Sequence, residues 1–251
     1  MILTATNVVS SLFGNIQDMD SVSVFLLILG PVIHIVGSSM VTSLIPNNIN
    51  KSPQKMRKWR STYIARITAG VTGVWATWSV YDSDLLRNDL LYGTSSSGRY
   101  CLIFSFGVHL IETVEMVVFK HYSMMTGHHV GALLSVMSIL LTNTAMGFAI
   151  LCLTSEVNAI TNKTRILHLI TELDKNSSEY KVNSQVNVMT FFIRVVVTFW
   201  MHAKSIQYFM ETPNIFFTIC MLTNTFLNIW NISCFKTLIQ KDILKMKMKI
   251  S

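Results

Sequence analysis

The chain has 251 residues, of which 51% are hydrophobic and only 13% are charged, with a formal net charge of +7. An ordinary soluble domain carries about 25% charged residues, so this composition excludes a water-soluble protein and makes lipid the solvent for most of the chain. The basic residues lie between apolar runs and not in a stripe along one surface, which argues against nucleic acid as a partner and is typical of membrane topology.

Apolar runs long enough to cross a bilayer recur along the chain. A transmembrane helix needs about 20 mostly apolar residues. No Lys or Arg precedes Lys51, so the first run is interpreted as a retained span and not as a signal peptide. The clear runs, in chain order, are Ser23–Ile45, Thr62–Tyr81, Tyr100–Phe119, Val186–Phe209 and Ile215–Phe235.

The middle of the chain allows two interpretations. The segment 128–160 is either one long helix or the start of two spans, His128–Leu141 and Ala145–Leu169, separated by a polar break at 142–144. Loops with Lys and Arg prefer the cytosolic side. Two spans give a lumenal N-terminus and place the basic loops in the cytosol, with only Arg87 and Arg99 on the lumenal side. We therefore choose two spans.

The chain is accordingly expected to be an all-α polytopic membrane protein with about seven transmembrane helices. Residues 1–50 supply a lumenal N-tail and the first span, residues 51–235 the main helical domain, and residues 236–251 a basic cytosolic tail. Lys247 and Lys249 match a dilysine retrieval signal to the endoplasmic reticulum. A basic tail that binds anionic lipid is the alternative interpretation.

The expected spans contain an unusual set of polar and ionisable residues. A charged side chain at the bilayer centre costs roughly 2.5–3.5 kcal/mol on insertion scales, so such residues face a cavity or a partner. They form either structural pairs between helices or a polar chamber in which histidine acts as a general base; for the set as a whole we favour the chamber. The candidate residues are Arg66, His109, Glu112, Glu115, His128, His129, Glu156, Asn158 and Arg194.

Two features of this set are local. His109, Glu112 and Glu115 are spaced three apart and predict one polar stripe on their helix. The adjacent pair His128 and His129 opens a span near the cytosolic face, where a helix N-terminus favours neutral imidazole. Adjacent helical side chains point about 100° apart and no third ligand accompanies them, so we predict no metal and no cofactor.

The order of several motifs resembles one family. The resemblance has two departures. Small members of that family carry Ser-Thr-Pro where this chain has Val157-Asn158-Ala159, and other members carry a paired Asp-x-x-Asp after the His-His pair, which does not follow His129 here. The motifs that carry the resemblance are Lys58–Thr62 (KWRST), Tyr81-Asp82, Glu112, His128-His129, Ser155-Glu156 with Asn158, Asn162 and Arg165, and Phe191-Phe192 with Arg194. Over residues 55–210 this order resembles the TLC-domain family, which includes ceramide synthases and translocation-associated membrane proteins.

The resemblance implies a helical bundle with a central polar cavity, located in the endoplasmic reticulum membrane. We expect a lipid-homeostasis protein that binds a lipid or acyl chain through the candidate residues, with membrane lipids as partners. One alternative is an N-acyltransferase similar to the ceramide synthases, in which His128 or His129 activates a sphingoid amine toward acyl-CoA; the missing acidic pair argues against it. Another is a secretory-pathway chaperone or cargo receptor. A rhodopsin-type receptor fits poorly, since Asp-Arg-Tyr and Asn-Pro-x-x-Tyr motifs are absent.

Overall fold

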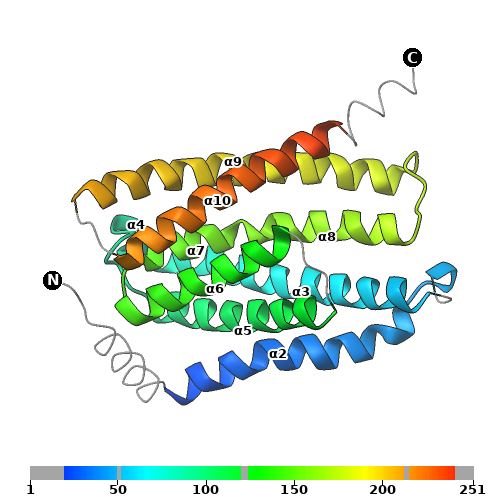
Figure 1. The fold of residues 1–251 in the computed structure, drawn as a ribbon, viewed down its shortest axis with the longest axis horizontal. Coiled ribbons are helices and arrows are strands. Elements are labelled where there is room, and N and C mark those ends of the chain that lie inside the picture. The colour runs from blue at the N-terminus through cyan, green and yellow to red at the C-terminus, as the bar shows by residue number, and fades with distance from the viewer. Residues whose placement is uncertain (1–19, 50–51, 120–123, 212–214, 241–251) are drawn as a thin grey trace.

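The computed structural model describes residues 20–49, 52–119, 124–211 and 215–240, and these ranges contain helices and short connections without a strand. The long helices lie side by side, and successive ones run in alternating directions (Figure 1). This confirms the all-α prediction. The helices are α2 (Ser21–Met40), α3 (Pro53–Asp82), α5 (Ser96–Val118), α6 (Met124–Thr142), α7 (Met146–Thr154), α8 (Glu156–Ile170), α9 (Ser178–Glu211) and α10 (Ile215–Leu238), with the short η1 (Val41–Leu44), η2 (Asn47–Ile49) and α4 (Asp84–Asn88) between them.

The outer surface of the bundle is apolar, as lipid requires. Large hydrophobic side chains such as Phe25, Val74 and Phe192 are more than half exposed. By length and composition, three helical segments of the described chain are able to cross a membrane: Ser21–Leu44, Ser96–Val118 and Ser178–Met210. The protein is therefore an integral membrane protein, while the count of about seven spans stays a prediction.

The two ends of the bundle differ in charge. The end of α2, the start of α3 and the α8–α9 connection lie at one end, on the right in Figure 1. Lys55, Arg57 and Lys58 begin α3 at this end, whereas Arg87 of α4 and Arg99 of α5 belong to the opposite end. The uneven distribution of Lys and Arg between loops, from which the topology was predicted, is thus also a difference between the two ends of the folded bundle.

A sharp turn divides the ambiguous middle of the chain into two helical segments. Asn143 and Ala145 adopt left-handed backbone angles, with φ of 50° and 63°. The Ala145 N–H donates to the Leu91 carbonyl at 2.5 Å, which ties the turn to the α4–α5 connection. A single long helix across 128–160 is thereby excluded. After the turn, α7 and α8 follow one another with a break at Ser155, and α3 packs along both.

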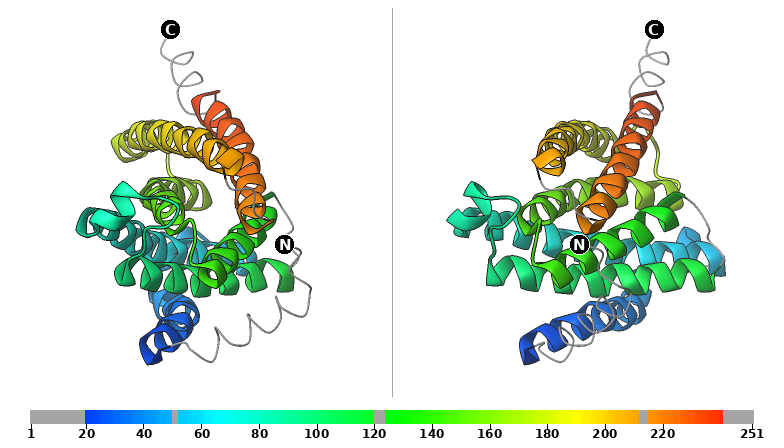
Figure 2. Two further views of the ribbon diagram at one scale, coloured as in Figure 1. Left: turned by 90° about the vertical axis from the view of Figure 1, so that its left-hand side faces the viewer. Right: turned by 60° about the vertical axis from the view of Figure 1, so that its left-hand side comes forward.

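Two glycines set how closely α2 approaches α5. A Cβ atom at Gly107 would lie 2.5 Å from the Leu27 carbonyl oxygen, and one at Gly30 would lie 2.9 Å from the Val108 nitrogen. Real Cβ atoms do not approach backbone so closely, so glycine at both positions permits the contact. Figure 2 shows α2 as the outermost helix on this side of the bundle, against α5. The contact brings His34 of α2 to the polar stripe of α5.

Candidate functional site

A chamber lies inside the bundle and consists of two adjoining cavities of about 120 and 270 Å³. The smaller cavity is enclosed mainly by α6, α7, α9 and α10, and the larger one mainly by α3, α5, α8 and α10, with two residues from the middle of α9. We call the two cavities together the chamber. Both cavities are lined by His109, His128, Glu156, Arg194 and Asn231.

The two cavities, which we call the arms of the chamber, differ in polarity. Ile139, Phe148 and Leu227 contribute apolar surface to the smaller cavity. The larger cavity has Glu112 and Lys163 in its wall. The shared polar residues stand at the junction of the arms. The chamber therefore offers apolar contact on one side and charge on the other, which suits an amphipathic molecule better than a wholly polar one.

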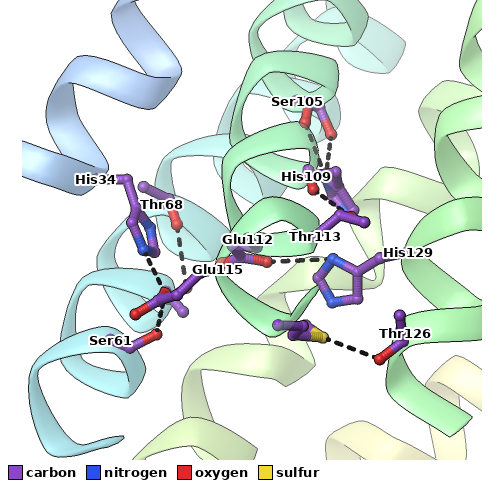
Figure 3. Close-up of polar contacts among 12 residues, drawn as sticks. His34, Ser61, Thr68, Ser105, His109, Glu112, Thr113, Glu115, Thr126 and His129 are labelled. Atoms are coloured by element: carbon purple, nitrogen blue, oxygen red, sulfur yellow. Dashed lines mark hydrogen bonds and ion pairs between the residues drawn. The ribbon is translucent and has the colours of Figure 1, made fainter. Parts of the chain in front are cut away.

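The histidines gather where α5 meets α6 (Figure 3). His129 is buried, and its Nδ1 lies 3.4 Å from Glu112 Oε2, an ion-pair distance. The His109 ring centroid is 5.1 Å from that of His129, and the His128 ring meets the His129 ring edge to face at 5.5 Å. Glu112 thus stands beside the ring of His129, although within the described residues His129 Nδ1 is buried without a hydrogen bond.

The tautomer of His109 follows from its neighbour. His109 Nδ1 lies 2.8 Å from the Ser105 carbonyl oxygen, which accepts hydrogen bonds and donates none. We therefore assign the proton to Nδ1, which leaves Nε2 as a hydrogen-bond acceptor. Within the described residues no group of His, Cys, Asp or Glu is arranged to hold a metal ion, and the absence of a metal stays a prediction.

Several polar atoms around the chamber have no protein partner. In the described part of the chain, His128 Nδ1, Arg194 Nε and Asn224 Oδ1 are buried without a hydrogen bond. No carboxylate of the same ranges lies within ion-pair distance of the Arg194 guanidinium. The Arg194 side chain is half-buried, and its guanidinium carbon lies 5.9 Å from the centroid of the Phe191 ring. The chamber is therefore suited to a ligand whose polar head accepts hydrogen bonds or carries negative charge.

The structure separates the candidate residues into two groups. Arg66 lies outside the chamber with its guanidinium 4.5 Å from the centroid of the Tyr63 ring. Asn158 joins α8 to α9 by donating to Thr190 Oγ1 at 2.8 Å. Glu115 contacts α2 and α3 instead of the chamber. Lys247 and Lys249 lie outside the described residues. The candidates that line the chamber are His109, Glu112, His128, His129, Glu156 and Arg194.

The polar stripe of α5 turns around the helix. Each step of three residues falls about 60° short of a full turn, so two steps displace Glu115 from His109 by about 120°. Glu112 therefore faces His129 while Glu115 faces His34, as Figure 3 shows. The helix α6 begins by Met124, which puts His128 beyond the first turn, where the helix dipole has little effect.

Sequence reasoning missed other polar residues of the site. Lys163 of α8 lines the larger cavity and was not among the candidate residues. Asn224 and Asn231 of α10 line the chamber, and Asn228 lies between them with its Nδ2 3.4 Å from the Thr198 carbonyl. These asparagines are spaced four and three apart in an apolar helix. This spacing places the three asparagines on one face of the helix, and it is the sequence pattern from which their position at the chamber could have been predicted.

Residues 58–240 match the family model described as TLC domain. TLC domain-containing protein 1 of Gallus gallus is 25% identical over 151 residues, which are 59% of this chain and 59% of that protein. TLC domain-containing protein 2 of Danio rerio is 25% identical over 192 residues, which are 75% of this chain and 78% of that protein. TLC domain-containing protein 1 of Homo sapiens is 24% identical over 59% of this chain and 61% of its own length.

Proposed function

The chain belongs to the TLC-domain family of membrane proteins, and we propose that it binds the acyl chain of a lipid in the chamber and acts in membrane lipid homeostasis. The observation that carries the proposal is the division of the chamber into an apolar arm and a polar junction. A membrane lipid has the same division. We further propose the endoplasmic reticulum membrane as its location, in keeping with the basic C-terminal tail.

In this proposal the acyl chain lies along the apolar arm and the lipid head stays at the junction. Ile139, Phe148 and Leu227 supply apolar contact to the chain. Arg194 and His128 stand where the head would lie, and each has a buried nitrogen atom without a hydrogen-bond partner among the described residues. The acyl chain passes from one apolar environment, the bilayer, to another, so close packing in the arm and hydrogen bonds to the head supply the affinity.

Filling the apolar arm tests the proposal. Ala132 of α6 lines the smaller cavity, so Ala132→Phe places a ring in the space assigned to the acyl chain. Val130 of the same helix is 42% exposed on the outer surface, which makes Val130→Phe the matched control. We expect lipid quantified by mass spectrometry to co-purify with the wild type and Val130→Phe and to be mostly lost from Ala132→Phe. Equal lipid in the two variants, or none in the wild type, contradicts the proposal.

A second candidate is the N-acyltransferase, favoured by the position of the histidine pair. His128 lines both arms of the chamber, and His129 is held beside Glu112. A neutral imidazole would remove a proton from a sphingoid amine as the nitrogen attacks the thioester carbonyl of acyl-CoA. The amide bond forms, the carbon–sulfur bond breaks, and the thiolate takes the proton from the imidazolium. The absence of a paired Asp-x-x-Asp after His129 argues against this reaction.

The acyltransferase is tested with purified protein, radiolabelled acyl-CoA and a sphingoid base. The comparison is between the wild type and the double variant His128→Ala, His129→Ala, each shown to be folded by its thermal unfolding. Acylated product from the wild type alone establishes the enzyme. No product from either protein eliminates the reaction for this substrate class and leaves lipid binding as the function of the chamber.

A further inference from the structure

A second recess lies outside the chamber, between α2, α3 and α5. It is an open groove of about 330 Å³ at the basic end of the bundle. We call it the α2 groove. Its wall from α2 precedes residues 58–240, the part of the chain that matches the TLC-domain family. The groove is therefore partly built from a helix that the family match does not include.

Two arginines give the α2 groove its charge. Arg57 and Arg60 are one turn apart on α3 and both line the groove. The guanidinium carbon of Arg57 lies 4.0 Å from the centroid of the Phe119 ring, and Arg60 Nη1 donates to Thr42 Oγ1 at 3.3 Å. These contacts hold both side chains at the groove. Among the described residues neither guanidinium has a carboxylate within ion-pair distance.

The acidic residue in the groove wall is already engaged by the protein. Glu115 Oε2 accepts a hydrogen bond from Ser61 Oγ at 2.8 Å and lies 3.0 Å from His34 Nε2. Glu115 also acts on Arg57 through its charge, but neither arginine forms an ion pair within the described chain. Paired guanidinium forks on one helical face match the oxygens of a phosphate, which arginine binds in bidentate fashion.

Part of the groove wall is apolar and continues onto the outer surface. Ile35, Val114 and Val118 line the groove and are 56%, 46% and 63% exposed. In a membrane protein such residues face acyl chains. A phosphate at the arginines would therefore be followed by hydrocarbon along these side chains. Basic residues at one end of a membrane bundle also attract anionic lipid from the facing leaflet.

We propose that the α2 groove binds an anionic phospholipid, with its phosphate at Arg57 and Arg60 and one acyl chain along Ile35, Val114 and Val118. The charge of the arginines and the apolar wall both match this occupant. The site is separate from the chamber, so it stands or falls independently of the function proposed above.

The experiment is a lipid titration of the purified full-length protein followed by native mass spectrometry. The probes are phosphatidic acid and phosphatidylcholine with the same acyl chains, each added in detergent. Arg60→Gln removes one groove cation. Lys58 is exposed, lies on the same helix and does not line the groove, so Lys58→Gln is the matched control for charge. Arg57→Gln is the second test variant if Arg60→Gln does not fold.

We expect the wild type and Lys58→Gln to bind phosphatidic acid in preference to phosphatidylcholine. Loss of one charge-assisted phosphate contact in Arg60→Gln or Arg57→Gln is expected to weaken phosphatidic acid binding about tenfold. Equal binding of the two lipids by the wild type overturns the proposal, as does an equal loss in Lys58→Gln. Displacement of the lipid by millimolar inorganic phosphate would indicate a simple anion site and also overturn it.

Discussion

Helix α5 carries two glutamates one turn apart, and each meets a histidine of another helix. Glu115 contacts His34 at 3.0 Å and also accepts from Ser61 at 2.8 Å, which joins α5 to both α2 and α3. Glu112 lies 3.4 Å from His129 and lines the chamber. The residue types are the same in the two regions, but the surroundings are not.

This difference is why we treat the Glu115–His34 pair as structural and propose a functional role for the Glu112–His129 pair. The Glu115 carboxylate has two close protein partners, so its main effect is to fix the position of α2. Among the described residues, the Glu112 carboxylate has one longer contact and borders a cavity in which other polar atoms have no hydrogen-bond partner. Polar groups left unsatisfied beside a cavity are expected to interact with a ligand.

The largest effect is expected from a substitution that forces α2 away from α5 and so removes the Glu115–His34 contact. Gly107→Ala places a Cβ atom 2.5 Å from the Leu27 carbonyl, so the helices must separate and His34 loses Glu115. We expect a loss of about 3 kcal/mol in the free energy of unfolding, from overpacking and the broken pair. Gly127→Ala is the control, because its Cβ would meet Phe226 at an ordinary 3.8 Å. Thermal unfolding in detergent measures both, and equal stability of the two variants contradicts the close approach.

Removing the Glu115 carboxylate should have the next largest effect. Glu115→Leu leaves His34, which is 4% exposed, without its partner. We expect a loss of about 2 kcal/mol in the free energy of unfolding, since a buried polar group left unsatisfied costs 1–3 kcal/mol. The double variant with His34→Leu should recover part of this loss. An unchanged unfolding midpoint in Glu115→Leu would show that the pair does not hold α2.

Glu112→Gln tests whether the second glutamate acts on lipid binding and not on stability. The amide keeps an oxygen next to His129 and removes the charge from the chamber wall. We expect the free energy of unfolding to change by less than about 1 kcal/mol, while the composition of the lipid that co-purifies changes. Mass spectrometry and thermal unfolding of the same preparation separate these effects. A large loss of stability with unchanged lipid would assign Glu112 to structure, like Glu115.

The smallest effect concerns the N-terminal end of α2. Asp20 accepts from the Ser23 N–H at 2.6 Å, and this hydrogen bond, with one from Tyr100, lowers the pKa of its carboxyl below the ordinary 3.8. Because the pKa of this carboxyl is lower in the folded state, the Asp20 cap stabilises the folded protein at neutral pH. This contribution to stability is lost as the pH falls below 3.8 and through the lowered pKa. The wild type should lose slightly more stability on acidification to pH 3 than Asp20→Asn does. Parallel unfolding curves would contradict this.

The sequence predicted the helical class and the two-segment middle because these depend on local features. Hydropathy fixes where lipid-facing helices lie, and the polar break at 142–144 became the turn. The chamber was foreseen because the charges of α5, α6, α8 and α9 require an interior. The partner of each charge was not foreseen. His34 alone in an apolar run gives no local sign that Glu115 lies beside it, and Arg66 finds its ring partner on its own helix.

The pair that fixes α2 also sets a condition on membrane insertion. Glu115 follows His34 by 81 residues. At about 5–20 residues per second, α2 leaves the ribosome roughly 4–16 s before its partner exists. A permanently charged side chain in place of His34 would add about 2.5–3.5 kcal/mol to insertion during that interval. An imidazole without a charge does not carry this cost and can still donate a hydrogen bond to the Glu115 carboxylate. The chain can therefore insert α2 early and fix its position once α5 arrives.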